Sequence, residues 1–198
     1  MARPRTISDA ALLGAARRVF TQQGAQAGAR AVAEAAGISQ TVLFQRFGTK
    51  EALFFAAMLP RPMNVDAILG ALPEPGAPAA RQHLLAIAAR FFAEIRAALP
   101  GTLRGALHPA YPKALEAAHR TGGEESLLAA LTTRLRVLQE RGDLAANLDP
   151  LAAAEGLVAL LHGLALGDVL GAGAPGPDGV ERAVCQVWHG FVPGGAAG

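Results

Sequence analysis

The sequence predicts an all-α protein, with a small helical domain at the amino end and a larger helical bundle behind it. Apolar residues recur every three or four positions over long segments, as they do on one face of an α-helix. No segment alternates apolar and polar residues in the manner of a β-strand. Glycines and prolines gather between the apolar segments and near the carboxyl end, where they mark loops. We expect domains over residues 1–54 and 55–198.

The first helix is predicted over residues 8–23. Ser8 suits the capping position, because its side-chain oxygen can accept a hydrogen bond from a free backbone amide of the first turn. Gly24 ends the segment. Arg17 and Arg18 of this helix are expected to point outward.

Two short helices joined by a tight turn are predicted over residues 30–47, and the second of them runs from Gln40 to Phe47. Gly37 follows the first helix, at a position that needs a left-handed backbone. Ser39 is expected to cap the second helix, and Thr49 a third helix that begins at Lys50. Two short helices around a Gly-containing turn form the helix-turn-helix arrangement, whose second helix enters the major groove of DNA.

The outward residues of the second short helix suit nucleic-acid recognition. Gln and Arg form paired hydrogen bonds with adenine and guanine edges, and Thr can meet a thymine methyl group. Lys50 stands in the first turn of its helix, beside free backbone amides that favour a phosphate. The short arm that holds Arg3 and Arg5 is either a frayed terminus or a segment that follows the phosphate backbone or enters the minor groove. The predicted DNA contacts are Arg3, Arg5, Arg30, Ser39, Gln40, Thr41, Phe44, Gln45, Arg46, Thr49 and Lys50.

The charge distribution favours DNA binding over a plain helical hairpin, which would show the same local pattern. Residues 1–50 hold seven cations and two anions, a formal charge of +5, whereas the remaining residues sum to −3. A basic head on a slightly acidic body is typical of a protein that binds nucleic acid through the head alone.

Helices are predicted along the rest of the chain, with Pro and Gly at their ends. Residues 63–78 are expected to form a linker around a short helical turn at residues 65–72, and Pro100-Gly101 is expected to end a long helix. The predicted segments are 50–59, 79–99, 102–107, 112–120, 124–141, 149–170 and 178–191.

The segment from residue 149 to residue 170 is apolar on nearly every side. A helix of this kind must be covered all round, which one helical body cannot easily do. We therefore expect a homodimer in which the last two helices of each chain form a four-helix interface. Its predicted residues are Gly156, Leu160, Gly163, Leu164, Gly167, Val184, Val187, Trp188 and Phe191.

A pocket for a small, mostly apolar molecule is expected among the body helices, where apolar and aromatic residues stand beside a few polar groups. Ordinary core packing is the more frequent role of any one such residue. The candidates are Phe91, Phe92, Ile95, Leu103, His108, Tyr111, Leu128, Leu131 and His162.

Other classes of protein lack support in the sequence. Cys185 is the single cysteine, which excludes an internal disulfide and a cysteine-rich metal site. No nucleophile elbow, phosphate-binding loop or dinucleotide fingerprint appears, so we expect no enzyme, no catalytic residue, no cofactor and no metal. The sequence shows neither a charged-then-apolar leader nor an uninterrupted apolar run of about eighteen residues. We therefore expect no membrane span and a cytoplasmic location.

The order of these parts resembles the tetracycline-repressor-like (TetR) family of bacterial transcriptional regulators. The resemblance covers about a quarter of the chain and rests on several spacings that hold together. The residues that carry it are Ala15-Ala16 to Phe20 with Gly24, Val32 to Ser39, Leu43 to Phe47, and Lys50 to Leu53.

The resemblance implies a ligand-responsive regulator, most often a repressor, that binds a palindromic double-stranded operator as a homodimer and is released by a small effector. The family usually has Tyr on a phosphate at the position of Phe44, so that contact is expected to be lost here. It also tends to place a capping Ser or Thr where this chain has Ala27, Gly28 and Ala29. The alternative function is a helical dimerisation or small-molecule-binding protein without sequence-specific DNA binding.

Overall fold

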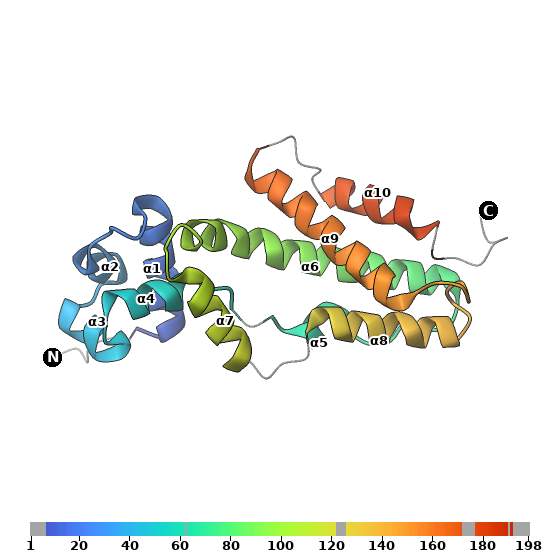
Figure 1. Cartoon of the computed structure of the whole chain (residues 1–198), viewed down its shortest axis with the longest axis horizontal. Helices are drawn as coiled ribbons and strands as arrows, with labels where there is room; N and C mark the ends of the chain where they lie inside the picture. The colour runs from blue at the N-terminus through green and yellow to red at the C-terminus, as the bar shows by residue number, and fades with distance from the viewer. Residues whose placement is uncertain (1–6, 62, 122–125, 172–176, 190, 192–198) are drawn as a thin grey trace. The chain divides into compact units, whose positions relative to one another are not determined.

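The computed structural model describes residues 7–61, 63–121, 126–171, 177–189 and 191, and every regular element within them is an α-helix (Figure 1). The all-α fold predicted from the sequence is therefore confirmed. The helices are α1 (Asp9–Gln23), α2 (Ala29–Ala36), α3 (Gln40–Phe47), α4 (Lys50–Met58), α5 (Val65–Leu69), α6 (Ala77–Gly105), α7 (Tyr111–Thr121), α8 (Leu127–Glu140), α9 (Pro150–Val169) and α10 (Pro177–Trp188).

The helices gather into two compact units. Unit 1 comprises Met1–Arg61 and Pro100–Gly123, and unit 2 comprises Pro62–Leu99 and Glu124–Gly198. Helix α6 contributes to both, since its last six residues belong to unit 1. The functional boundary expected between residues 54 and 55 stays a prediction.

Unit 1 is built around α1, which packs against both α2 and α4. Its core consists of residues from all four short helices, among them Phe20, Val32, Leu43 and Phe54, each at most 2% exposed. The rings of Phe20 and Phe54 meet edge to face, with centroids 5.1 Å apart. This core fixes the position of α3 against α1 and α4, and so determines which face of α3 remains outward.

Local capping sets the ends of these helices as predicted. The side-chain oxygens of Ser8, Ser39 and Thr49 accept hydrogen bonds from amides three residues further on, which satisfies a donor that the helix itself leaves unpaired. Gly37 has φ 67° and ψ 32°, the left-handed conformation expected in the turn between α2 and α3.

Arg17 does not point outward, and that expectation was wrong. Its Nε donates to the carbonyl oxygen of Ala57 at 2.7 Å, and a terminal nitrogen donates to that of Leu59 at 3.2 Å. These carbonyls belong to the last turn and the cap of α4, where helix carbonyls lack partners within the helix. Arg17 therefore ties α1 to the carboxyl end of α4. Its neighbour Arg18 is exposed, as expected.

The prediction that Pro100-Gly101 ends the long helix was also wrong. Helix α6 continues through Pro100 to Gly105, so residues 102–107 do not form a separate helix. Proline removes one amide and disturbs the preceding turn, but packing outweighs this local penalty because Gly101 and Gly105 are both buried. At Gly105 a side chain would overlap the ring of Tyr111, so glycine is needed for the close approach.

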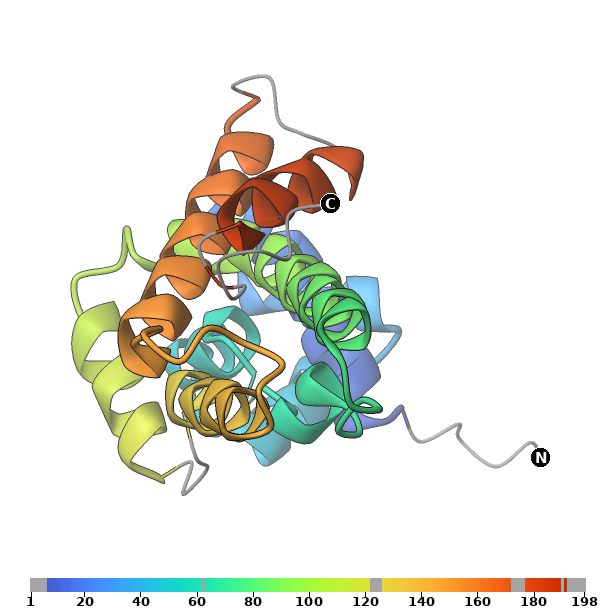
Figure 2. The ribbon, with the colours of Figure 1, turned by 90° about the vertical axis from the view of Figure 1, so that its right-hand side faces the viewer.

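In unit 2, α8 packs along α9, α10 packs on α9, and α5 packs on α8 (Figures 1 and 2). The core includes apolar side chains from α6 together with these helices. The largest buried side chains of this core are Trp188, Phe91, Phe92 and Phe191.

The segment expected to be a linker, residues 63–78, is held to unit 2 by polar anchors. Arg134 on α8 donates to the carbonyl oxygens of Gly70 and Ala71 at 3.0 and 3.3 Å. The buried carboxylate of Asp143 accepts the Gly76 amide at 2.7 Å and lies 3.0 Å from the guanidinium of Arg141.

Among the described residues, α9 is the one helix long and apolar enough to span a membrane, by length and composition alone. Core helices of water-soluble proteins pass the same test when they are buried. Only 28% of the apolar window of α9 is buried within the chain, so much of this helix lies on the surface.

Candidate nucleic-acid interface

Helix α3 presents four exposed side chains: Gln40, Thr41, Phe44 and Gln45. At 3.6 residues per turn they occupy an arc of about 140°. The rest of the helix faces the core of unit 1, with Leu43 fully buried and Val42 and Phe47 half-buried. The arc consists of two amides, one hydroxyl and one aromatic ring that is 37% exposed.

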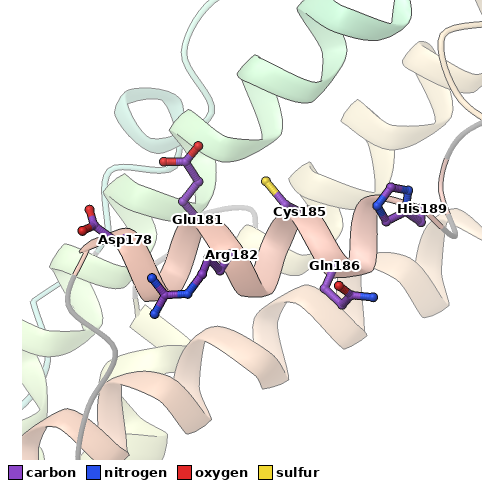
Figure 3. Close-up of a pocket in the computed structure, with 6 residues that line it drawn as sticks. All are labelled: Asp178, Glu181, Arg182, Cys185, Gln186 and His189. Atoms are coloured by element: carbon purple, nitrogen blue, oxygen red, sulfur yellow. The ribbon is translucent and has the colours of Figure 1, made fainter. Parts of the chain in front are cut away.

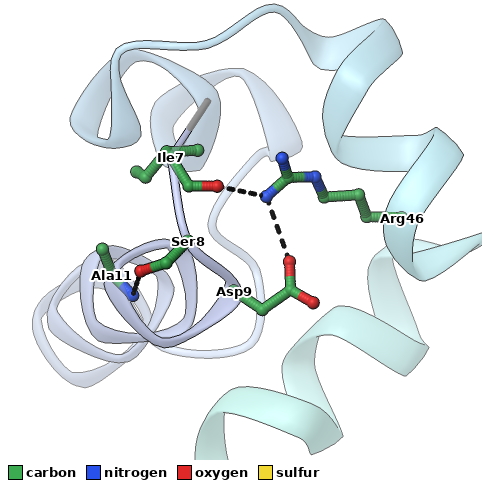
Figure 4. A network of polar contacts seen from close by, with 5 residues as sticks. All are labelled: Ile7, Ser8, Asp9, Ala11 and Arg46. Carbon is green, nitrogen blue, oxygen red and sulfur yellow. Dashed lines mark hydrogen bonds and ion pairs between the residues drawn. The ribbon is translucent and has the colours of Figure 1, made fainter. Parts of the chain in front are cut away.

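Arg46, predicted as a DNA contact, is bound within the chain instead of lying in this arc (Figure 4). One terminal nitrogen donates to the carbonyl oxygen of Ile7 at 2.7 Å and to the Asp9 carboxylate at 3.0 Å. The Arg46 side chain is 24% exposed, whereas that of Asp9 is 73% exposed. Arg46 therefore fixes the end of α3 to the start of α1.

The other predicted contacts surround the arc or lie outside the described residues. Ser39 and Thr49 are exposed caps at the amino ends of α3 and α4, and Lys50 follows in the first turn of α4. Arg30 on α2 is 81% exposed and pairs with Glu34, one turn further along, at 2.8 Å; this hydrogen bond raises the pKa of Arg30. Arg3 and Arg5 lie outside the described residues.

The amino end of α2 lacks the side-chain cap that Ser or Thr would supply. Gly28 occupies the cap position without a side-chain hydrogen bond, and Ala27 beside it is buried. Phe44 has no hydroxyl with which to hold a phosphate.

The assignment of all eleven residues to DNA binding stays a prediction.

The residues predicted to line an effector pocket fall into both units. Leu103, His108 and Tyr111 belong to unit 1, where the His108 ring lies against Phe54 and Phe55 with centroids 5.3 and 5.1 Å apart. Burial raises the pKa of Tyr111. Unit 2 holds the remaining candidates, which are Phe91, Phe92, Ile95, Leu128, Leu131 and His162.

An apolar cavity of about 10 Å³ lies in unit 2 between α6, α8 and α9. This volume is about that of one water-sized probe. Two predicted pocket residues, Phe91 and Leu131, line the cavity. The exposed His162 does not line it, but its ring contacts that of Phe91 edge to face, with centroids 5.4 Å apart. The sequence analysis did not name the other residues that line the cavity, which are Leu84, Ile87, Ala88, Leu127, Leu157, Val158 and Leu161. The three of them on α6 share the helical spacing of Phe91 and could have been found from it.

The residues predicted for a dimer interface differ in exposure. Gly156, Gly163 and Val187 are exposed, and Leu160, Leu164 and Gly167 are half-buried. Val184, Trp188 and Phe191 are buried in the core of unit 2. The polar residues on α10 and directly after it are exposed and, together with Cys185, line a pocket (Figure 3): Asp178, Glu181, Arg182, Gln186 and His189. Cys185 on the same helix contacts the Arg81 guanidinium through its sulfur at 2.8 Å.

Comparisons with known proteins agree with this architecture. Residues 12–57, which include α2, α3 and nearly all of α1 and α4, match the model of the family described as "Bacterial regulatory proteins, tetR family". No curated protein sequence matches the chain.

Solved structures share the fold over almost the whole chain. A protein from Mesorhizobium loti assigned to the TetR family of transcriptional regulators is 21% identical, with a TM-score of 0.66 over 91% of this chain and 94% of that one. The regulator FadR from Bacillus subtilis, in complex with stearoyl-CoA, is 13% identical, with a TM-score of 0.64 over 91% and 97%. A transcriptional regulator from Saccharomonospora viridis, in complex with choline, is 18% identical, with a TM-score of 0.64 over 92% and 96%.

The family match falls on the helices that hold the α3 arc, and the structural matches extend through the body behind them. Residues 12–57 therefore match the TetR family of bacterial regulators, and the chain as a whole shares the fold of solved transcriptional regulators such as the M. loti protein.

Proposed function

We propose that the protein is a ligand-responsive repressor that binds a palindromic operator as a homodimer and is released by a small, mostly apolar effector. The observation that carries the proposal is the outward arc of α3. Four side chains able to contact base edges stand on a short helix whose other face is fixed in the core of unit 1. This is the geometry that a recognition helix needs.

Phosphate contacts would come from residues around the arc. Lys50 and Arg30 supply cations, and the amino ends of α3 and α4 supply backbone amides near Ser39 and Thr49. Arg3 and Arg5 in the amino-terminal arm would add two further positive charges. Such contacts position a protein on the duplex without reading its sequence.

A second copy of the chain would cover the exposed face of α9. Along this face run Ala152, Gly156, Ala159, Gly163 and Leu166, spaced alternately by four and three residues and all exposed. This spacing is typical of a seam between helices, and the small residues let two helix backbones approach closely. The half-buried Leu160 and Leu164 would border the seam, and the polar face of α10 would form its rim.

The effector would enter the apolar core of unit 2. Its lining between α6, α8 and α9 is wholly apolar, which suits an acyl chain better than a cation. Ligand sites of drug-sized molecules hold about 300–1,000 Å³, so these helices would have to separate for a ligand to bind. The stearoyl-CoA complex of the B. subtilis regulator provides a first ligand to test, and the choline complex of the S. viridis protein provides a contrasting one.

The DNA-binding proposal is tested by selection of duplexes from a random library, followed by titration of the selected duplex. We expect a palindromic sequence to be enriched, and the double variant Gln40→Ala/Gln45→Ala to lose preference for it. Gln82→Ala, which removes an exposed amide from α6, is the matched control. A protein that dimerises but enriches no sequence would instead be a helical dimerisation or small-molecule-binding protein.

Dimerisation is tested separately with Gly163→Arg. A side chain at Gly163 meets no atom within 4 Å in the single chain, so the fold of the protomer should tolerate it. Sedimentation should then show monomers, whereas Thr133→Arg on the exposed face of α8 should leave the dimer intact. A Gly163→Arg protein that remains dimeric would contradict an interface centred on α9.

Effector binding is tested by thermal melting with stearoyl-CoA and with choline. A ligand that binds only the folded protein raises the melting temperature. We expect stearoyl-CoA to raise it and to release the selected duplex, and choline to do neither. The reverse order would contradict an apolar effector.

A further inference from the structure

The outward arc of α3 contains no cationic side chain. Its members are Gln40, Thr41, Phe44 and Gln45, all exposed. Guanine is read most often by Arg or Lys, whose donors pair with its O6 and N7 atoms. The arc therefore lacks the side chains with which proteins usually recognise a G·C pair from the major groove.

Arg46 is the one cation of α3, and its side chain binds residues at the start of α1. Its guanidinium is turned toward the start of α1, where it binds the Ile7 carbonyl oxygen and the Asp9 carboxylate (Figure 4). Around the helix axis, Arg46 lies about 100° beyond Gln45, the edge of the arc. To contact a base, Arg46 would have to break two hydrogen bonds, one of them to the charged carboxylate of Asp9.

The side chains of the arc match the chemistry of A·T pairs. A glutamine amide pairs with N6 and N7 of adenine, by donating one hydrogen bond and accepting another. The thymine 5-methyl group accepts apolar contact from a Phe ring or from the methyl group of Thr. Phe44 lies between Gln40 and Thr41 around the helix, so both kinds of contact fall on one face.

We propose that α3 reads A·T pairs, through glutamine contacts to adenine and through apolar contact of Phe44 with a thymine methyl group. The inference rests on the proposed function and deepens it by naming the base pairs at the centre of each half-site. Phe44 is then a specificity-determining residue, and Arg46 is a positioning residue that sets the orientation of α3 without selecting a base. Lys50 and Arg30, on other helices, serve the phosphates.

The test uses the full-length protein and the duplex selected from a random library. We expect the positions contacted by α3 to be A·T pairs. Replacing thymines one at a time by deoxyuridine removes a single methyl group, and at the contacted position this should weaken binding about fourfold, the effect of one buried methyl group. Replacing an adenine by 7-deazaadenine, which lacks N7, should weaken binding about tenfold at a glutamine contact.

The contacts are assigned by variants. Phe44→Ala should abolish the loss caused by deoxyuridine, and Gln40→Ala or Gln45→Ala should abolish the loss caused by 7-deazaadenine. Arg46→Met should weaken binding to all duplexes alike and leave the order of preference among them unchanged. Asp9→Asn, which removes one partner of Arg46 and keeps the helix cap at Ser8, should act in the same direction with a smaller effect.

Two outcomes would overturn the inference and leave the proposed function standing. One is a selected half-site whose α3 positions are G·C pairs. The other is an Arg46→Met protein that folds but loses a preference for guanine at one position. If no sequence is enriched at all, the proposed function itself fails. An unchanged affinity on every deoxyuridine duplex would overturn the role of Phe44.

Discussion

Replacing Arg17 by Met should destabilise the protein markedly, although Arg17 stands beside an exposed arginine and looks like a surface residue in the sequence. Its guanidinium donates to the carbonyl oxygens of Ala57 and Leu59 at 2.7 and 3.2 Å. Burial lowers the pKa of Arg17. Hydrogen bonds from charged groups contribute about 1.5–3 kcal/mol each, and water can partly replace this half-buried donor. The expected loss is therefore about 2–3 kcal/mol for the pair.

A loss of this size should lower the melting temperature by about 4–12 °C, given about 2–4 °C per kcal/mol for a protein of this length. Arg18→Met is the matched control, because it removes the same charge from the adjacent, exposed position. It should change the stability by less than about 0.5 kcal/mol. Circular dichroism during heating measures both. Equal melting temperatures for the two variants would refute the assignment of Arg17 as the tie between α1 and α4.

Three further predictions concern the polar anchors and the phosphate contacts. Burial and the charge of Arg134 lower the pKa of His83 from 6.5 to about 4, so the folded state keeps this ring neutral. The unfolded state then binds more protons between these pH values, so stability should fall as the pH drops from about 6.5 to about 4, by on the order of 1 kcal/mol once solvent screening is allowed for. Asp143→Asn should cost about 3 kcal/mol in a urea titration, because it leaves the charge of Arg141 uncompensated beside a buried site. Lys50→Ala should weaken binding to all duplexes alike and reduce the slope of log K against log salt by about one.

Each of these has its own control. His83→Gln, which can still accept a hydrogen bond from Arg134, should flatten the fall in stability between pH 6.5 and 4. Asp66→Asn changes an exposed carboxylate in the same unit and should leave the urea midpoint unchanged. Lys113→Ala, on the exposed face of α7, should not alter the salt slope. A Lys50→Ala protein with an unaltered slope would show that Lys50 is only a solvated charge.

Local chemistry made much of the fold predictable from the sequence. Ser8, Ser39 and Thr49 each act on an amide three residues away, and Gly37 adopts a conformation that suits glycine. Such interactions are complete within one turn of chain, so the residue types at those spacings are sufficient to reveal them. For the same reason, α3 was predicted with the bounds that the structure has.

What the sequence did not reveal depends on contacts between distant residues. Arg17 and Arg46 find carbonyl partners about forty positions away, and only the packed fold brings those partners within reach. Pro100 lies inside α6 because buried neighbours outweigh its local penalty. The α3 arc could be located by periodicity, but the commitment of Arg46 to α1 required the structure, and this commitment changes which bases the helix is expected to read.

The central claim, that two copies of α3 enter the major groove of one duplex, is tested most directly by footprinting the selected duplex with the wild-type dimer. The claim predicts two protected major-groove patches, related by two-fold symmetry and about 34–36 Å apart, which corresponds to one turn of DNA. A single patch, or uniform protection that the Gln40→Ala/Gln45→Ala variant leaves unchanged, would contradict it.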